Sequence, residues 1–228
     1  MNDANRDDRL AGPLDGALNL LDRQILDCDG RMLGKVDDLE LTQQEDGLAV
    51  TAVLTGPAAL LPRLGGGLGD RLVTTWSRLK VSEPDRLRPW RIDMDRVDRL
   101  DSALHLSVRR DGVLTRDTES YRFGSLTGME ASGPDGAHLG RVMDARFGPG
   151  LHGRLVVRHL LIGQGRPGSL LGYDRHDQQG PWLVRATVGR LHRHTGIVDI
   201  ASAQILWNRR QVLLTARPRA RPGPAVGN

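Results

Sequence analysis

The chain has 228 residues, of which 39% are hydrophobic and 26% are charged, and this balance excludes an intrinsically disordered protein. A single cysteine, Cys28, excludes an intrachain disulfide and is typical of a reducing compartment. No run approaches the ~18–20 apolar residues of a membrane-spanning helix, and the polar N-terminus lacks the features of a signal peptide. We therefore expect a cytoplasmic protein without a transmembrane segment.

The charge is distributed unevenly along the chain. Residues 1–110 carry 16 basic and 19 acidic residues (−3), whereas residues 111–228 carry 16 basic and 9 acidic residues (+7). A basic half favours acidic partners, which include nucleic acid, an anionic membrane surface and the acidic face of another protein. An ordinary solvated surface is the simpler interpretation, and the charge alone leaves nucleic-acid binding and peripheral membrane association open.

The first elements in chain order are predicted to be strands joined by tight turns. Residues 1–19 are expected to form a flexible N-terminal segment, since glycine and proline interrupt any hydrophobic period. Residues 20–28 and 33–41 are predicted strands, separated by Asp29 and Gly30, a pair that suits positive φ angles in hairpin turns. Residues 48–54 alternate as a half-buried strand does.

The later elements complete one unit, and a second unit then follows the same plan. A glycine-rich loop at 64–70 precedes an apolar segment, and a strand closes the first unit near Val108. The polar residues 109–124 are predicted to be a linker. We expect the two units to span 20–108 and 125–215, followed by a basic, proline-rich, disordered tail over 216–228.

A ten-residue pattern, Asp-Gly-x-x-Leu-Gly-[Lys/Arg]-Val-x-Asp, occurs once in each predicted unit, and the two copies lie 106 positions apart. Apolar residues late in each unit also repeat, at an offset of 108 positions. Ile200 and Ile205 are therefore predicted to be equivalent to Ile92 and Val97. The motif positions are Asp29, Gly30, Gly34, Val36 and Asp38 in the first copy, and Asp135, Gly136, Gly140, Val142 and Asp144 in the second.

The two-residue strand period slips at the end of both copies of the motif. Val36 and Leu39 differ by three positions, and Val142 and Ala145 do the same. A shared slip indicates a β-bulge or a sharp bend at Asp38 and Asp144. A structural role for these aspartates is therefore favoured over catalysis.

The repeated motif, in its setting of short apolar strands, resembles the PRC-barrel family, which is named after the cytoplasmic barrel of the photosynthetic reaction centre H subunit. The resemblance covers residues 20–108 and 126–215. It implies an all-β fold of two tandem small PRC-like β-barrels with short helical turns, used mainly as docking surfaces and without conserved catalytic residues. We also hypothesise that the two copies pack as a pseudo-two-fold pair.

Candidate chemical motifs are incomplete, so we expect no catalytic, cofactor-binding or metal-binding residues. Residues 163–168 match Gly-x-Gly-x-x-Gly, but Pro167 and the residues after it do not begin a helix that could face a pyrophosphate. An enzyme would instead need a pocket assembled in space, for instance around His159 or Asp144. The second half holds six histidines without a cysteine pair or flanking carboxylate that would complete a zinc site: His138, His152, His159, His176, His192 and His194.

The sequence predicts a non-enzymatic adaptor or assembly module that binds a protein partner through its barrel surfaces. The alternative is an RNA- or ribosome-associated protein that uses the basic second half. Five arginines are the candidate contacts with an anionic partner: Arg209, Arg210, Arg217, Arg219 and Arg221.

Overall fold

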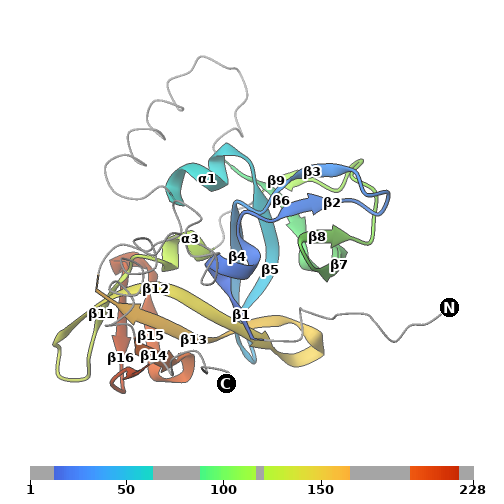
Figure 1. Cartoon of the computed structure of the whole chain (residues 1–228). Helices are drawn as coiled ribbons and strands as arrows, with labels where there is room; N and C mark the ends of the chain where they lie inside the picture. The colour runs from blue at the N-terminus through green and yellow to red at the C-terminus, as the bar shows by residue number, and fades with distance from the viewer. Residues whose placement is uncertain (1–12, 64–87, 117–120, 165–195, 221–228) are drawn as a thin grey trace, which may run out of the picture. The chain divides into compact units, whose positions relative to one another are not determined.

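The structure, a computed structural model, describes residues 13–63, 88–116, 121–164 and 196–220 (Figure 1). In these residues nearly all regular structure is β, which confirms the all-β prediction. The chain separates into two compact units: unit 1 holds residues 1–125 and 147–156, and unit 2 holds residues 126–146 and 157–228. Within the described ranges the sheets are open, and none closes into a barrel.

Unit 1 contains two sheets. In the smaller sheet the order is β3-β2-β8-β7, with β2 and β8 parallel and the other pairs antiparallel (Figure 1). In the larger one, β10, β4, β5, β6 and β9 follow one another as antiparallel neighbours. The elements are β1 (Leu14–Asp15), a π-helical turn (Gly16–Leu20), β2 (Gln24–Leu26), β3 (Met32–Lys35), β4 (Asp38–Gln44), β5 (Gly47–Thr55), α1 (Pro57–Arg63), β6 (Trp90–Asp93), a 3-10 turn (Met94–Arg96), β7 (Val97–Leu100), β8 (Ala103–Leu106), β9 (Thr115–Arg116) and β10 (Tyr121–Arg122), after which α3 (Phe123–Leu126) follows.

The core of unit 1 begins earlier in the chain than the sequence indicates. Leu14 and Leu20 are buried, although residues 14–19 were expected to belong to a flexible segment. The turn packs here because Gly16 has no Cβ: one would lie 2.7 Å from the Phe123 ring. Phe123 and Phe147 are fully buried and meet edge to face, with ring centroids 5.7 Å apart.

The segment predicted to be a linker, 109–124, contributes two short strands to unit 1. In β9, Arg116 pairs with Trp90 of β6, and its guanidinium lies 3.5 Å from the centre of the Trp90 ring. In β10, Tyr121 pairs with Leu41 of β4. The polar composition of this stretch reflects edge strands rather than a free connection.

Unit 2 is a sheet in which β12, β11, β16 and β15 are successive neighbours and β13 pairs with β14, which pairs with β17. Residues 147–156 fall in the predicted second unit but cluster with unit 1. The elements are β11 (Glu130–Ser132), β12 (His138–Pro149), a 3-10 turn (Leu151–Gly153), β13 (Leu155–Gly163), β14 (Gly196–Asp199), a 3-10 turn (Ile200–Ser202), β15 (Ala203–Leu206), a 3-10 turn (Trp207–Arg209), β16 (Gln211–Leu214) and β17 (Arg219–Ala220).

The internal repeat predicted from the motif is present in the strand pairing. β2 pairs antiparallel with β3 and parallel with β8, and β11 pairs in the same way with β12 and β16. The hairpin pairs carry the same register shift, after Ile25 in β2 and after Ala131 in β11. β7 and β8 likewise form a hairpin that corresponds to β15 and β16.

The predicted correspondence of the late strands is wrong by two residues. Ile92 of β6 is buried, and its structural counterpart is the buried Val198 of β14, not Ile200. Likewise β7 begins at Val97 and β15 at Ala203, an offset of 106. The second repeat gains its two extra residues in the next turn. Residues 207–210 connect β15 to β16, whereas only residues 101–102 connect β7 to β8.

The bend predicted at Asp38 is present, because the chain passes from the smaller sheet to the larger one directly before this residue, whereas no break occurs at Asp144. In the first copy the chain leaves β3 after Lys35 and enters β4 at Asp38, and the register shift between β4 and β5 follows Glu40. In the second copy β12 continues through Asp144. Residues 38–41 are all buried, so alternation of polarity does not mark the faces of β4.

No helix in the described ranges is long and apolar enough to cross a membrane. The predicted glycine-rich loop at 64–70, most of the 163–168 pattern and residues His176, His192, His194 and Arg221 lie outside the described residues.

Candidate functional site

The turn at the start of the motif is built alike in both units. Gly30 and Gly136 both have φ of 75°, a conformation that glycine adopts without strain. The preceding aspartates each bind an arginine from the end of the repeat: Asp29 pairs with Arg109 at 3.3 Å and Asp135 with Arg217 at 2.7 Å. The pKa of Asp135 is lowered, first by the hydrogen bond that Arg217 donates. Arg217 therefore has a partner within the chain.

The middle of the motif packs against the rest of its own unit. Val36 and Val142 are fully buried. A Cβ on Gly34 would lie 2.8 Å from the Thr55 hydroxyl, and a Cβ on Gly140 would overlap the carbonyl oxygen of Gly163. Only the second of these glycines needs a positive φ, of 116°. Both glycines thus permit a close approach of chain segments.

The last aspartate of the motif accepts a backbone hydrogen bond in both copies. Asp38 accepts from the Leu39 amide at 2.8 Å, and Asp144 accepts from the Ala145 amide at 2.7 Å. Asp38 also accepts from the Gly124 amide at 2.8 Å, so it fixes the start of α3. Because its side chain is fully enclosed, Asp38 positions the backbone and does not face solvent.

The charge of Asp38 is disfavoured by its surroundings. Burial raises the pKa of Asp38 to about 6, against the lowering effect of the Gly124 and Leu39 amides and of the Arg63 and Arg122 side chains. Since the folded state binds this proton more tightly than the unfolded state does, the carboxyl stabilises unit 1 increasingly as the pH falls through 6 toward 4.

Arg63 links α1 to the start of β4 in unit 1. Its guanidinium donates to the Asp37 carbonyl at 2.6 Å and lies 3.5 Å from the Asp22 carboxylate. The Asp37 carboxylate accepts from the Gly56 amide at 2.6 Å. Desolvation raises the pKa of Asp37, opposed by the Gly56 and Thr55 hydrogen bonds and by Arg63. These contacts tie three segments of unit 1 together.

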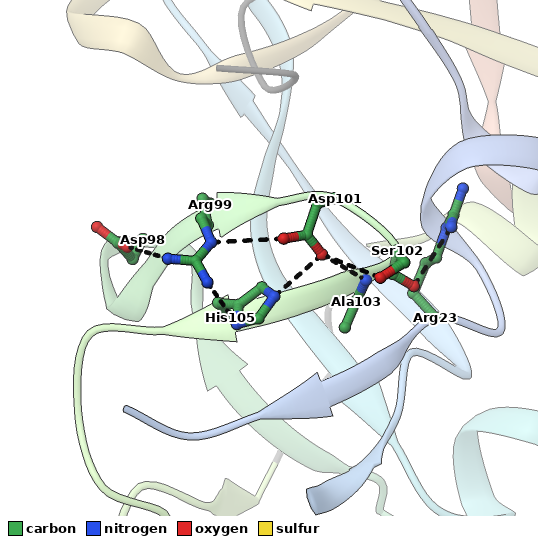
Figure 2. A network of polar contacts seen from close by, with 7 residues as sticks. All are labelled: Arg23, Asp98, Arg99, Asp101, Ser102, Ala103 and His105. Atoms are coloured by element: carbon green, nitrogen blue, oxygen red, sulfur yellow. Dashed lines mark hydrogen bonds and ion pairs between the residues drawn. The ribbon is translucent and has the colours of Figure 1, made fainter. Parts of the chain in front are cut away.

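A second polar network covers the β7–β8 hairpin, as Figure 2 shows. Asp101 Oδ1 accepts from the Ala103 amide at 2.9 Å and lies 3.0 Å from His105 Nε2. Arg99 Nη2 lies 3.3 Å from His105 Nδ1 and also pairs with Asp98. The pKa of Asp101 is lowered to about 2, first by the Ala103 amide, against partial desolvation, and further by His105 and Arg99.

The hydrogen bonds of this network occupy both nitrogens of His105. A guanidinium can only donate, so Nδ1 accepts from Arg99, and Nε2 carries the hydrogen that points to Asp101. An imidazole held in this way has no free lone pair to take a proton from a substrate. The network is therefore a clasp between neighbouring strands.

The sequence analysis missed this clasp, although a signal was present. The signal is the spacing of Arg99, Asp101 and His105, because Asp101 and Ser102 form a two-residue turn that brings Arg99 opposite His105. In unit 2 the corresponding positions hold Ile205 and Leu213. The clasp thus belongs to the first repeat alone.

The four described arginines among those proposed for an anionic partner do not form one cluster within unit 2. Arg209 and Arg210 are exposed in the turn before β16, whereas Arg217 and Arg219 are exposed beyond its other end. Arg219 pairs with Ile197 through the β17–β14 ladder. A four-residue strand separates the two sets by roughly 13 Å at ~3.3 Å per residue.

The residues proposed for a spatially assembled enzyme site are His159 and Asp144, both on strands of unit 2. His159 faces Asp199 across the β13–β14 ladder, and its Nδ1 is buried without a hydrogen-bond partner among the described residues. Asp144 caps the next residue. In the described ranges no three His, Cys, Asp or Glu side chains lie close enough to hold a metal ion.

A scan of protein-family models finds no match to this chain, and a search of curated proteins finds none either.

Proposed function

We propose that this chain is a cytoplasmic protein of two tandem PRC-like β-barrel units that acts as a non-enzymatic adaptor or assembly module. The observation that carries the proposal is the use of the shared motif. In both repeats its glycines, valine and aspartates form turns, core and backbone caps. Because the motif residues have structural roles, binding of a partner would depend on the surface residues, which differ between the repeats.

Unit 1 exposes two large apolar side chains of the kind that protein partners bind. Leu60 of α1 and Tyr121 of β10 are 36% and 48% exposed. Arg122, which follows Tyr121 in β10, donates to the Ala58 carbonyl of α1 at 3.4 Å. Exposed aromatic and aliphatic side chains beside an arginine are typical of protein–protein interfaces.

The test is crosslinking followed by pulldown from the native host, with and without nuclease. We expect a protein partner that survives nuclease treatment and moderate salt, and that is lost from the double variant Leu60→Gln, Tyr121→Gln. Met32→Gln is the matched control, because Met32 is similarly exposed, at 49%, but lies on β3. Loss of every partner after nuclease treatment would contradict the adaptor function.

RNA or ribosome binding is the second candidate, favoured by the exposure of Arg209, Arg210 and Arg219. It predicts retention on nucleic acid that weakens steeply with salt. Neutralising Arg217, Arg219 and Arg221 to Gln should then abolish retention. Arg217 also pairs with Asp135 at 2.7 Å, so an anionic partner would compete with this exposed ion pair.

A further inference from the structure

The two corresponding outermost strands, β7 of unit 1 and β15 of unit 2, differ in how they are protected. Each is four residues long and pairs on one side only in the described part of the chain. An exposed strand edge can pair with another chain, and proteins usually block such edges with charges or bulges. β7 has both kinds of protection.

The protection of β7 is visible in its register and in its side chains. Its pairing with β8 shifts between Val97 and Arg99. Asp98 and Arg99 place charges on the strand itself, and Arg99 belongs to the clasp with Asp101 and His105 (Figure 2). A foreign strand would have to desolvate these charges and follow an irregular edge.

β15 has neither form of protection. Its residues Ala203, Gln204, Ile205 and Leu206 carry no charge, and all four pair with β16 in a regular register. Arg99 of the first repeat is replaced here by Ile205. Strand length is the same in both repeats, so charge and regularity are what distinguish the two edges.

The hydrogen-bond phase of the hairpin shows which backbone groups point outward. The Thr215 amide donates to the Ser202 carbonyl at 2.8 Å. Because hydrogen-bonded pairs alternate along an antiparallel ladder, Gln204 and Leu206 face β16, and the N–H and C=O of Ile205 face away from it. The Ala203 amide already donates to the Ile200 carbonyl, which leaves Ile205 at the centre of the pairable edge.

The charges at the two ends of β15 are of opposite sign. Exposed Arg209 and Arg210 follow the strand, and exposed Asp199 precedes it. When a strand with such ends pairs antiparallel with its own copy about a two-fold axis, each basic end lies beside the partner's acidic end. This self-complementarity favours a second copy of the chain over an unrelated strand.

We propose that β15 is a homodimerisation edge, pairing antiparallel with β15 of a second copy of this chain about Ile205. The short edge offers few backbone hydrogen bonds, so the dimer is expected in the micromolar range, about −8 kcal/mol at a 1 M standard state. The proposal is independent of the adaptor function.

Sedimentation equilibrium of the full chain over a concentration series tests the proposal. We expect a monomer–dimer equilibrium, and Ile205→Pro should give a monomer. The substitution removes an N–H that points away from β16, a position where proline is tolerated in an edge strand. Ile205→Val, which keeps the amide and a similar side chain, should stay dimeric.

The charges at the ends of β15 are tested by Asp199→Asn, which keeps an oxygen to cap Ala201. This variant should weaken the dimer about fivefold, since exposed ion pairs contribute up to about 1 kcal/mol.

Hydrogen exchange on the unaltered chain gives a second measurement that needs no variant. We expect the Ile205 amide to become protected as protein concentration rises, while the amides of β7 do not change. A chain that stays monomeric at high concentration overturns the proposal. So does a dimer that Ile205→Pro leaves intact while the variant stays folded, or an Ile205 amide whose exchange is independent of concentration.

Discussion

The two copies of the motif share their defining residues, yet the surrounding structure constrains them differently. In unit 1, Asp38 is enclosed and Arg63 ties α1 to the adjoining strand. In unit 2, the tightest constraint lies at Gly140, which faces the Gly163 backbone with a positive φ. The comparison teaches that a shared sequence motif fixes a strand pairing without fixing which of its residues is least replaceable.

The largest difference between the copies is expected at the central glycine. Gly140→Ala should destabilise unit 2 by about 3 kcal/mol, because its Cβ meets a backbone carbonyl and the backbone is strained. Gly34→Ala should cost only about 1 kcal/mol, since the Thr55 side chain can turn away. Hydrogen exchange measured separately for peptides of each unit checks both values. Equal costs would remove the contrast between the repeats.

The next largest effect concerns pH and Asp38. Asp38→Asn keeps an acceptor for the Leu39 and Gly124 amides but cannot titrate. From a folded pKa of about 6 and an unfolded value of 3.8, the unaltered protein should gain roughly 2–3 kcal/mol relative to the variant between pH 8 and pH 4. Denaturant unfolding at the two pH values measures this gain.

A smaller effect on stability is expected at the residue with positive φ that precedes the first strand of each repeat, Asp22 before β2 and Gly128 before β11. Asp22 and Gly128 donate to the carbonyls of Val36 and Val142 and have φ of 61° and 83°. Gly128→Ala should cost about 1 kcal/mol, because a left-handed conformation disfavours a Cβ. Asp22→Gly should be close to neutral, since relief of strain offsets the lost contact with Arg63. Thermal unfolding compares the pair, and an equal loss for both substitutions would contradict the shared geometry.

The smallest effect is expected from the clasp on β7 and β8. The lowered pKa of Asp101 means that its contribution is present above 3.8 and is lost as the pH falls toward about 2. The groups remain partly accessible to solvent, so Asp101→Asn should cost about 0.5 kcal/mol at neutral pH. A carboxyl titration by NMR checks the pKa directly. In Arg99→Gln the pKa should rise only slightly, because the Ala103 amide is its main cause.

The sequence predicted the repeat and its β character because glycine turns and buried valines leave a local pattern. It could not reveal that Asp38 accepts a hydrogen bond from Gly124, because the two residues are far apart in the chain. Composition also misassigned residues 109–124, since two-residue edge strands such as β9 and β10 have no hydrophobic period. The Arg99–His105 contact depended on a hairpin register that spacing alone left open.

The parallel pairing of β2 with β8, and of β11 with β16, has a consequence for folding. In each repeat the two parallel strands are separated by roughly 80 residues of sequence. Gln24 of β2 pairs with Ala103 of β8, and Glu130 of β11 pairs with Gln211 of β16. Contacts of such long sequence separation slow folding. During synthesis, β2 and β11 therefore stay without their parallel neighbours until most of each repeat has left the ribosome.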